Sequence, residues 1–157
     1  MTLAPPAGAE LELRGLRKTY EWRGETLLTL DGIDMVARAG EFVALIGPSG
    51  CGKSTLFHIL AGLEAPSGGE VLIDGASVDS RLGALAFMPQ RDALLPWRRA
   101  LDNVTIGLEV AGVKRADARA RAAPLLERFG LGGFESAWPW QLSGGMRSRA
   151  AFLRTIL

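Results

Sequence analysis

The sequence is poor in cysteine and histidine and contains no long apolar run. Cys51 is its one cysteine, so no intrachain disulfide can form and no cysteine-rich metal site exists. No apolar segment approaches the roughly 20 residues that span a bilayer, and residues 1–6 lack the basic stretch and apolar run of a secretory signal. We therefore expect a protein of a reducing, cytoplasmic compartment, which reaches a membrane only through another protein.

A bias in charge is also missing. Lys and Arg together number 18 and Asp and Glu 17, so the formal net charge is +1. This balance gives no general attraction to nucleic acid or to an anionic membrane, and no nucleic-acid partner is expected. The 157 residues, 48% hydrophobic and 22% charged, suit one domain of ordinary size with a packed core.

Residue patterns predict a mainly β first part and a mainly helical second part. After a tail at 1–10, which we expect to be flexible, alternating apolar residues predict a strand at 11–20, and Asp31-Gly32 predicts a tight hairpin between 27–30 and 33–36. The apolar run at 41–46 predicts a strand covered on both faces. The other predicted elements are a helix at 53–61, strands at 70–73 and 85–88, and helices at 101–111, 115–129 and 144–157. Pro124 is expected to kink or divide the helix at 115–129.

A phosphate-binding loop is the most specific motif. The pattern G-x-x-x-x-G-K-[ST], placed between a buried-type strand and a helix, is met by Gly47, Pro48, Ser49, Gly50, Cys51, Gly52, Lys53 and Ser54. The glycines let backbone N–H groups and the positive helix end face a phosphate, to which Lys53 adds charge. Ser54 offers Mg²⁺ a hydroxyl ligand, and Thr55 can hydrogen-bond a phosphate oxygen. The alternative is a glycine-rich turn that carries these residues by chance.

A second glycine motif points to a family. Leu60-Ala61-Gly62-Leu63 and Pro66-Ser67-Gly68-Gly69 follow the loop, and Leu142-Ser143-Gly144-Gly145-Met146 precedes the last helix. With the loop, these segments resemble the nucleotide-binding subunits of ABC transporters, whose signature motif is similar to 142–146. The resemblance implies an α/β P-loop NTPase fold, with an antiparallel β subdomain and P-loop core at 11–90 and a helical subdomain at 91–157. It also implies ATP and Mg²⁺ as cofactors.

The signature motif has a role of its own in this family. One subunit's signature binds the ATP that its partner's P-loop holds, so Ser143, Gly144 and Gly145 imply a head-to-tail dimer with a second nucleotide-binding subunit. These residues also stand at a helix start, where backbone N–H groups favour an anion. Taken alone, Ser-Gly-Gly before a helix is more often a loop and a helix cap.

Two further residues match the family's pattern. Gln90 matches the Q-loop glutamine, whose amide oxygen reaches Mg²⁺ and the attacking water, so the resemblance implies Ser54 and Gln90 as metal ligands. Tyr20 matches the aromatic residue that stacks on adenine. The alternatives are an exposed polar loop residue for Gln90 and simple strand packing for Tyr20.

The segment after Gln90 resembles importers of the nitrate, sulfonate and taurine group. It reads Arg91-Asp92-Ala93-Leu94-Leu95-Pro96-Trp97-Arg98-Arg99. In that family this surface receives a membrane permease, which implies a location on the inner face of the cell membrane and a solute-binding protein in the wider system. The alternative is that Trp97 packs within the helical subdomain.

The family's strand aspartate, general-base glutamate and switch histidine have no match in these 157 residues. No Asp-Glu pair occurs, and the one histidine, His58, lies in the helix behind the loop. We therefore expect an incomplete nucleotide-binding domain, truncated after the signature helix, with part of the core sheet absent and little hydrolysis. The alternatives are a hydrolysis-deficient nucleotide-binding or interaction module, and an ABC ATPase acting away from the membrane.

Overall fold

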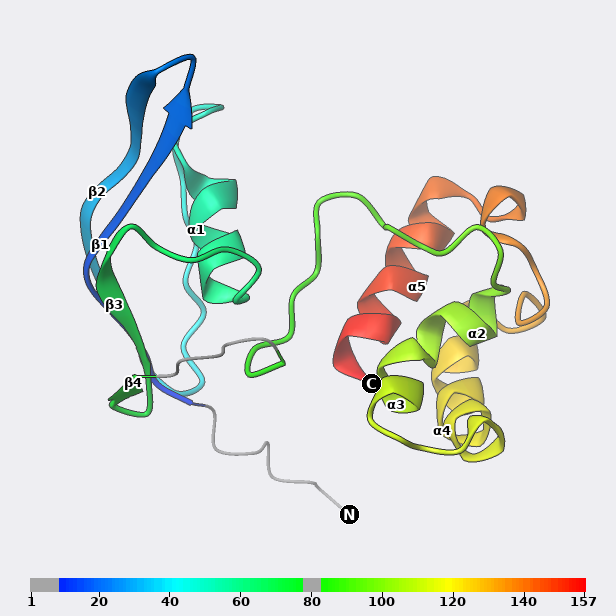
Figure 1. Cartoon of the computed structure of the whole chain (residues 1–157). Coiled ribbons are helices and arrows are strands. Elements are labelled where there is room, and N and C mark those ends of the chain that lie inside the picture. Colours follow the sequence, from blue (N-terminus) through cyan, green and yellow to red (C-terminus); the bar gives the residue numbers. More distant parts are fainter. Residues whose placement is uncertain (1–8, 78–82) are drawn as a thin grey trace. The chain divides into compact units, whose positions relative to one another are not determined.

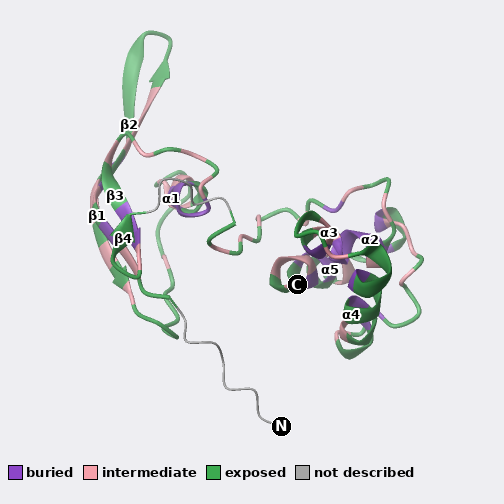
Figure 2. Ribbon diagram, turned by 60° about the horizontal axis from the view of Figure 1, so that its bottom comes forward, coloured by how far each residue is buried: buried purple, intermediate pink, exposed green. Residues whose placement is uncertain are grey.

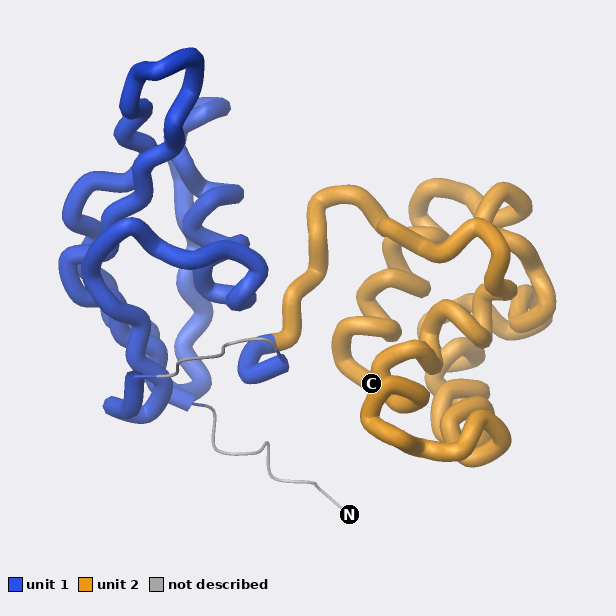
Figure 3. The backbone as a smooth tube through the Cα atoms, in the orientation of Figure 1, with its two compact units in different colours: residues 1–85 blue, residues 86–157 orange. Residues whose placement is uncertain are grey.

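The computed structural model describes residues 9–77 and 83–157. The chain forms two compact units, Met1–Leu85 and Ala86–Leu157, which are coloured separately in Figure 3 and are described here one at a time. Residues 1–8 of the expected flexible tail lie outside the described residues. Glu10 is held by Asp74, because the Glu10 amide donates to Asp74 Oδ1 at 2.8 Å and the Asp74 amide donates to the Glu10 carbonyl at 2.9 Å.

The first unit contains a four-stranded antiparallel sheet (Figure 1). Its strand order is β2-β1-β3-β4, and the strands are β1 (Leu11–Trp22), β2 (Glu25–Ala37), β3 (Gly68–Ile73) and β4 (Ala76–Ser77). Leu13 and Leu16 of β1 are buried, as the apolar pattern predicts. The expected antiparallel opening and the strand at 70–73 are thus confirmed.

The predicted hairpin at Asp31-Gly32 is wrong. β2 runs through both residues, and the chain reverses instead at Arg23 and Gly24, whose φ angles are 54° and 80°. The pairing of β1 with β2 shifts register near Gly32, whose φ is 63°. A glycine with positive φ serves a β-bulge as well as a turn, and an arginine in a turn carries no sequence signal. The dipeptide therefore marks a bulge within a strand.

The strands predicted at 41–46 and 85–88 are also wrong. Residues 41–46 form no strand, and Phe42 and Ile46 are 93% and 96% exposed. Figure 2 colours the chain by burial, and the buried core residues of the first unit lie on the sheet and on helix α1 (Lys53–Leu60). Residues 85–88 likewise form no strand. Apolar composition specifies burial, but a strand also needs neighbours for its backbone hydrogen bonds. Within the described ranges, the sheet contains only β1 to β4, and none of them pairs with either segment.

Helix α1 (Lys53–Leu60) packs its apolar side against the sheet. This first core consists of Leu13, Leu16, Leu30, Leu56, Ile59, Leu60 and Val71. The helix ends before Gly62, whose φ of 73° is typical of a residue that terminates a helix. The predicted helix at 53–61 is therefore confirmed, and its start lies on the predicted phosphate loop.

The second unit is helical. Its elements are α2 (Ala100–Val104), α3 (Ile106–Val110), α4 (Arg115–Arg128), the 3₁₀ turn η1 (Pro139–Gln141) and α5 (Gly144–Ile156). The helix predicted at 101–111 is divided at Thr105, whereas α4 continues through Pro124 as one helix. The apolar core of this unit includes Ala100, Val104, Leu126, Leu131, Ala150 and Leu153. Among the described residues, no helix combines the length and apolarity needed to cross a bilayer.

A buried carboxylate joins α2 to α4. Asp102 is 5% exposed, and it accepts hydrogen bonds from Arg115 at 2.9 Å and from Arg119 at 2.8 and 2.9 Å. Burial alone raises the pKa of Asp102, but the hydrogen bonds and positive charges of Arg119 and Arg115 outweigh burial, so its pKa lies below the usual range. This cluster orients one helix against the other.

Candidate functional site

The phosphate loop approaches α1 through two left-handed glycines. Gly50 and Gly52 have φ angles of 84° and 91°, which side chains other than hydrogen rarely allow. Gly52 occupies the N-cap position and supplies no side-chain hydrogen bond to the helix. The first amides of α1 have no intrahelical acceptor, so they remain available to an anion.

Lys53 folds back over this loop. Its ammonium donates to the carbonyls of Gly47 at 2.8 Å and Pro48 at 2.6 Å, and it lies 3.3 Å from the Cys51 thiol. A positive charge therefore stands beside the uncapped start of α1. The loop fits a bound polyphosphate, because both the helix end and the ammonium favour negative charge.

Two glycines of the loop face close neighbours. A Cβ at Gly52 would lie 2.8 Å from Leu30 Cδ2 and 3.0 Å from the Thr29 carbonyl oxygen. A Cβ at Gly47 would lie 2.8 Å from the Cys51 sulfur. The glycines thus permit both the loop's own packing and its contact with β2.

The predicted metal ligands belong to different units. Ser54 is an exposed residue in the first turn of α1, and Gln90 is an exposed residue in the second unit. In the part of the chain that the structure describes, no three His, Cys, Asp or Glu residues cluster as a metal site. A hydroxyl and an amide oxygen suit Mg²⁺ as hard oxygen ligands, and their joint role stays a prediction.

Tyr20 has a partner that the sequence pattern does not predict. Its hydroxyl donates to Glu64 at 2.8 Å, and Lys18 lies 3.0 Å from the same carboxylate and 4.8 Å from the centre of the Tyr20 ring. The Tyr20 hydrogen bond, helped by Lys18, keeps the pKa of Glu64 below its usual value although burial opposes this. These contacts fix the orientation of the ring. Its stacking on adenine stays a prediction.

Ser143 caps helix α5. Its hydroxyl accepts a hydrogen bond from the Met146 amide at 3.3 Å, and Gly144 and Gly145 form the first turn. All three predicted signature residues are exposed. The predicted helix start is confirmed, and the exposed turn offers backbone N–H groups to an anion.

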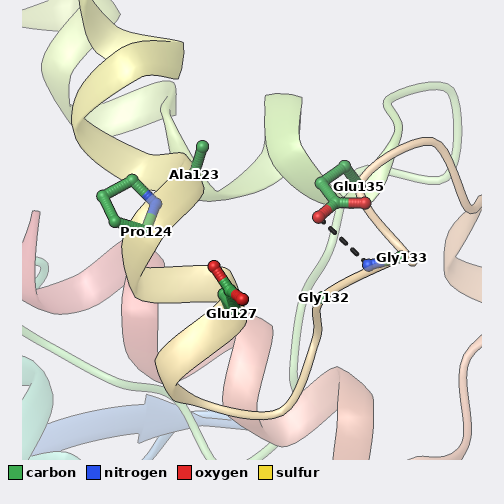
Figure 4. Close-up of a pocket in the computed structure, with 6 residues that line it drawn as sticks. All are labelled: Ala123, Pro124, Glu127, Gly132, Gly133 and Glu135. Carbon is green, nitrogen blue, oxygen red and sulfur yellow. Dashed lines mark hydrogen bonds between the residues drawn. The ribbon is translucent and has the colours of Figure 1, made fainter.

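An open hollow of about 490 Å³ lies elsewhere in the second unit (Figure 4). Its lining residues are Ala123, Pro124, Glu127, Gly132, Gly133 and Glu135. The Glu135 carboxylate accepts a hydrogen bond from the Gly133 amide at 3.1 Å. Two carboxylates and no lining cation disfavour a phosphate ligand, so this hollow is not a nucleotide site.

The ABC transporter family model matches residues 30–157. The chain is 42% identical over 147 residues to an uncharacterised ABC transporter ATP-binding protein of Methanocaldococcus jannaschii, an alignment that covers 94% of this chain and 55% of the relative. A taurine import ATP-binding protein of Rhizobium johnstonii is 42% identical (85% and 51% covered), and an aliphatic sulfonates import ATP-binding protein of Pseudomonas putida is 41% identical (96% and 52% covered). The chain spans about half the length of these curated relatives.

A solved structure agrees with these relatives. It is a dimeric ATP-binding cassette in a post-hydrolysis state, bound to ADP and Pi. It matches with a TM-score of 0.83 and 33% identity, and the match covers 93% of this chain and 68% of that chain. The expected P-loop NTPase fold class is thereby confirmed.

Proposed function

The chain belongs to the ABC transporter family, and on this premise we propose that it is the ATP-binding subunit of an importer, which couples ATP binding and hydrolysis to solute uptake through a membrane permease. The observation that carries the proposal is the phosphate loop, where Lys53 stands beside the uncapped start of α1. The relatives named for taurine and sulfonate import support the direction of transport.

The predicted nucleotide-binding residues each have a proposed task. The amides at the start of α1 and the Lys53 ammonium hold the β and γ phosphates. Ser54 would offer Mg²⁺ its hydroxyl and Gln90 its amide oxygen, the ion would neutralise phosphate charge, and Gln90 would orient the attacking water. Tyr20 presents its ring to adenine.

We propose that a second nucleotide-binding subunit completes the site. Ser143, Gly144 and Gly145 then contact the ATP held by the partner's phosphate loop, in a head-to-tail dimer. The exposure of all three residues and the amides of Gly144 and Gly145, which have no acceptor within α5, support this role. The matched cassette is itself dimeric.

The permease contact is proposed at the segment after Gln90. Trp97 is 70% exposed, and Pro96 beside it is also exposed, so this segment offers apolar surface to a partner. Through this contact the chain is held on the inner face of the cell membrane, and a solute-binding protein delivers the solute from the other side.

A hydrolysis-deficient nucleotide-binding module is the second candidate. These 157 residues contain no Asp-Glu pair, and they span about half the length of the curated relatives. Without a carboxylate to position water and to support Mg²⁺, we expect these residues by themselves to bind ATP but to hydrolyse it slowly.

Ser143→Arg tests the shared site. The bulky side chain should block access to the first turn of α5, so self-association in Mg-ATP should weaken by at least about thirtyfold, as for a lost hot-spot contact. The ATP affinity of the monomer, measured at chain concentrations too low for association, should stay unchanged, because Ser143 is proposed to contact the partner's nucleotide and not the chain's own. Analytical ultracentrifugation and equilibrium dialysis measure the two quantities. Ser136→Arg, at another exposed serine of the second unit, is the matched control; equal association of both variants would contradict the shared site.

Tyr20 is tested by two substitutions. Tyr20→Ala removes the ring and should weaken ATP binding by about tenfold, since base stacking contributes about 1–3 kcal/mol. Tyr20→Phe keeps the ring and loses only the hydrogen bond to Glu64, so its affinity should stay within about twofold of the original chain. Titration with a fluorescent ATP analogue measures both. Equal losses in the two variants would assign the role to the hydroxyl instead.

A further inference from the structure

One arginine joins the segment after Gln90 to the signature loop. Arg147 Nε donates to Asp92 Oδ2 at 3.0 Å, and Arg147 Nη1 donates to the Leu142 carbonyl at 2.8 Å. Asp92 lies two residues after Gln90, and Leu142 directly precedes Ser143. A single planar guanidinium therefore bonds two loops that are 50 residues apart in the sequence. Because its N–H groups point in fixed directions, it holds Asp92 and the Leu142 carbonyl at a set distance from each other.

A second arginine of α5 holds the same segment. Arg154 Nη1 donates to the Ala93 carbonyl and Arg154 Nη2 to the Asp92 carbonyl, each at 2.7 Å. Ala93 has a φ of 46°, a left-handed conformation that is costly for alanine. The strained turn persists where α5 supplies two charge-assisted hydrogen bonds. α5 thus fixes the backbone of the segment as well as its carboxylate.

The far end of the segment is held by α2. Asn103 is fully buried, and its Oδ1 accepts from the Leu95 amide at 2.7 Å while its Nδ2 donates to the carbonyls of Leu95 at 3.1 Å and Arg98 at 2.9 Å. Residues 92–98 are therefore tied to helices at both ends. A displacement imposed on this segment must be taken up by those helices.

We propose that Arg147 is a positioning residue, which transmits displacement of the segment after Gln90 to the loop that carries Ser143. The proposal rests on the proposed function, in which Ser143 contacts the partner's nucleotide. A partner that moves the segment would pull Asp92, and through Arg147 it would reorient the Leu142 carbonyl and the start of α5. ATP contact at Ser143 would, by reciprocity, restrain the segment.

The position of the pair favours this role over a contribution to stability. The Arg147 and Asp92 side chains are 36% and 31% exposed, and such partly solvated pairs contribute little to folding. The second unit has its own apolar core around Leu126, Leu131 and Leu153. Loss of the pair should therefore leave the unit folded while freeing the two loops from each other.

The test uses Arg147→Ala and Asp92→Asn, with Arg121→Ala at an exposed arginine of α4 as control. Self-association of the chain in Mg-ATP should weaken by about tenfold in each single variant. The double variant should be no weaker than the single variants, because all three lose the same contact. The ATP affinity of the monomer, measured at chain concentrations too low for association, and the unfolding midpoint should match those of the control. Arg147→Lys, which keeps charge but loses the planar guanidinium, should recover only part of the association.

A second readout needs no nucleotide. Exchange of the Met146 amide, which donates to Ser143 Oγ, should accelerate at least about fivefold in Asp92→Asn, when measured by NMR. Unchanged exchange, or additive losses of association in the two single variants, would overturn the proposal. If the original chain does not associate in Mg-ATP, the proposed shared site is wrong, and Arg147 has no role toward the partner's nucleotide. The exchange experiment would then still show whether Arg147 couples the segment after Gln90 to the loop before α5.

Discussion

Lys53→Ala should weaken Mg-ATP binding by at least about 100-fold. The ammonium lies at the phosphate loop and can replace its carbonyl partners, Gly47 and Pro48, by phosphate oxygens. Charge-assisted hydrogen bonds contribute about 1.5–3 kcal/mol each, and two such bonds account for about 3 kcal/mol, or a factor of more than 100. Equilibrium dialysis with labelled ATP measures the effect directly.

Lys114→Ala is the matched control for Lys53. Lys114 is exposed and lies in the second unit, at the N-cap of α4, so its removal changes net charge equally without touching the loop. It should leave ATP affinity within about twofold of the original, because Lys114 is not part of the loop and an exposed charge is screened by solvent and salt. Undiminished binding by Lys53→Ala would refute the phosphate-loop assignment.

Asp102→Ala should lower the free energy of unfolding of the second unit by about 1.5–3 kcal/mol, the usual contribution of hydrogen bonds to a charged group. Its buried carboxylate accepts hydrogen bonds from Arg115 and Arg119, and these two arginines are 62% and 44% exposed, so water can take over their hydrogen bonds after the substitution. This is a large share of the stability of a small unit. Urea unfolding followed by tryptophan fluorescence reports it. Asp117→Ala, at an exposed acid in the first turn of α4, should cost less than about 1 kcal/mol.

The Asp102 cluster also sets a pH dependence. The folded-state pKa of Asp102 lies below its usual value, so its stabilising contribution is fully present above the unfolded pKa of about 4 and is lost as pH falls through the lower folded pKa. Asp102→Ala should flatten this acid limb of the stability curve. An unchanged acid limb in the variant would assign acid unfolding to other carboxylates.

Short motifs are predictable from sequence where local geometry determines them. The helix at the phosphate loop begins at Lys53, and Ser143 caps α5. Both helix starts could be predicted because a glycine turn and a hydroxyl cap depend only on neighbouring residues. The bulge at Gly32 resembles a turn in sequence, since positive φ serves both. The run at 41–46 is apolar enough for a buried strand, but a strand requires neighbours that its own residues cannot specify.

Long-range polar contacts are not predictable in this way. Arg147 and Asp92 are 55 residues apart, and Tyr20 and Glu64 are 44 apart. Neither pair has a local pattern, because the topology alone brings the partners together. For Tyr20 and Gln90 the sequence predicts candidate roles, while the contacts that orient the Tyr20 ring and the loop after Gln90 appear only in the folded chain.

A glycine at position 52 is required by the fold itself, which limits what its presence says about function. Its φ is 91°, and a Cβ at this position would lie 3.0 Å from the Thr29 carbonyl oxygen. Glycine is therefore required there by the packing of the loop on β2, whether or not a nucleotide is ever bound. The backbone at Lys53 requires no particular residue, although its ammonium donates to the Gly47 and Pro48 carbonyls. Among related sequences, a retained Lys53 is therefore better evidence of nucleotide binding than a retained Gly52.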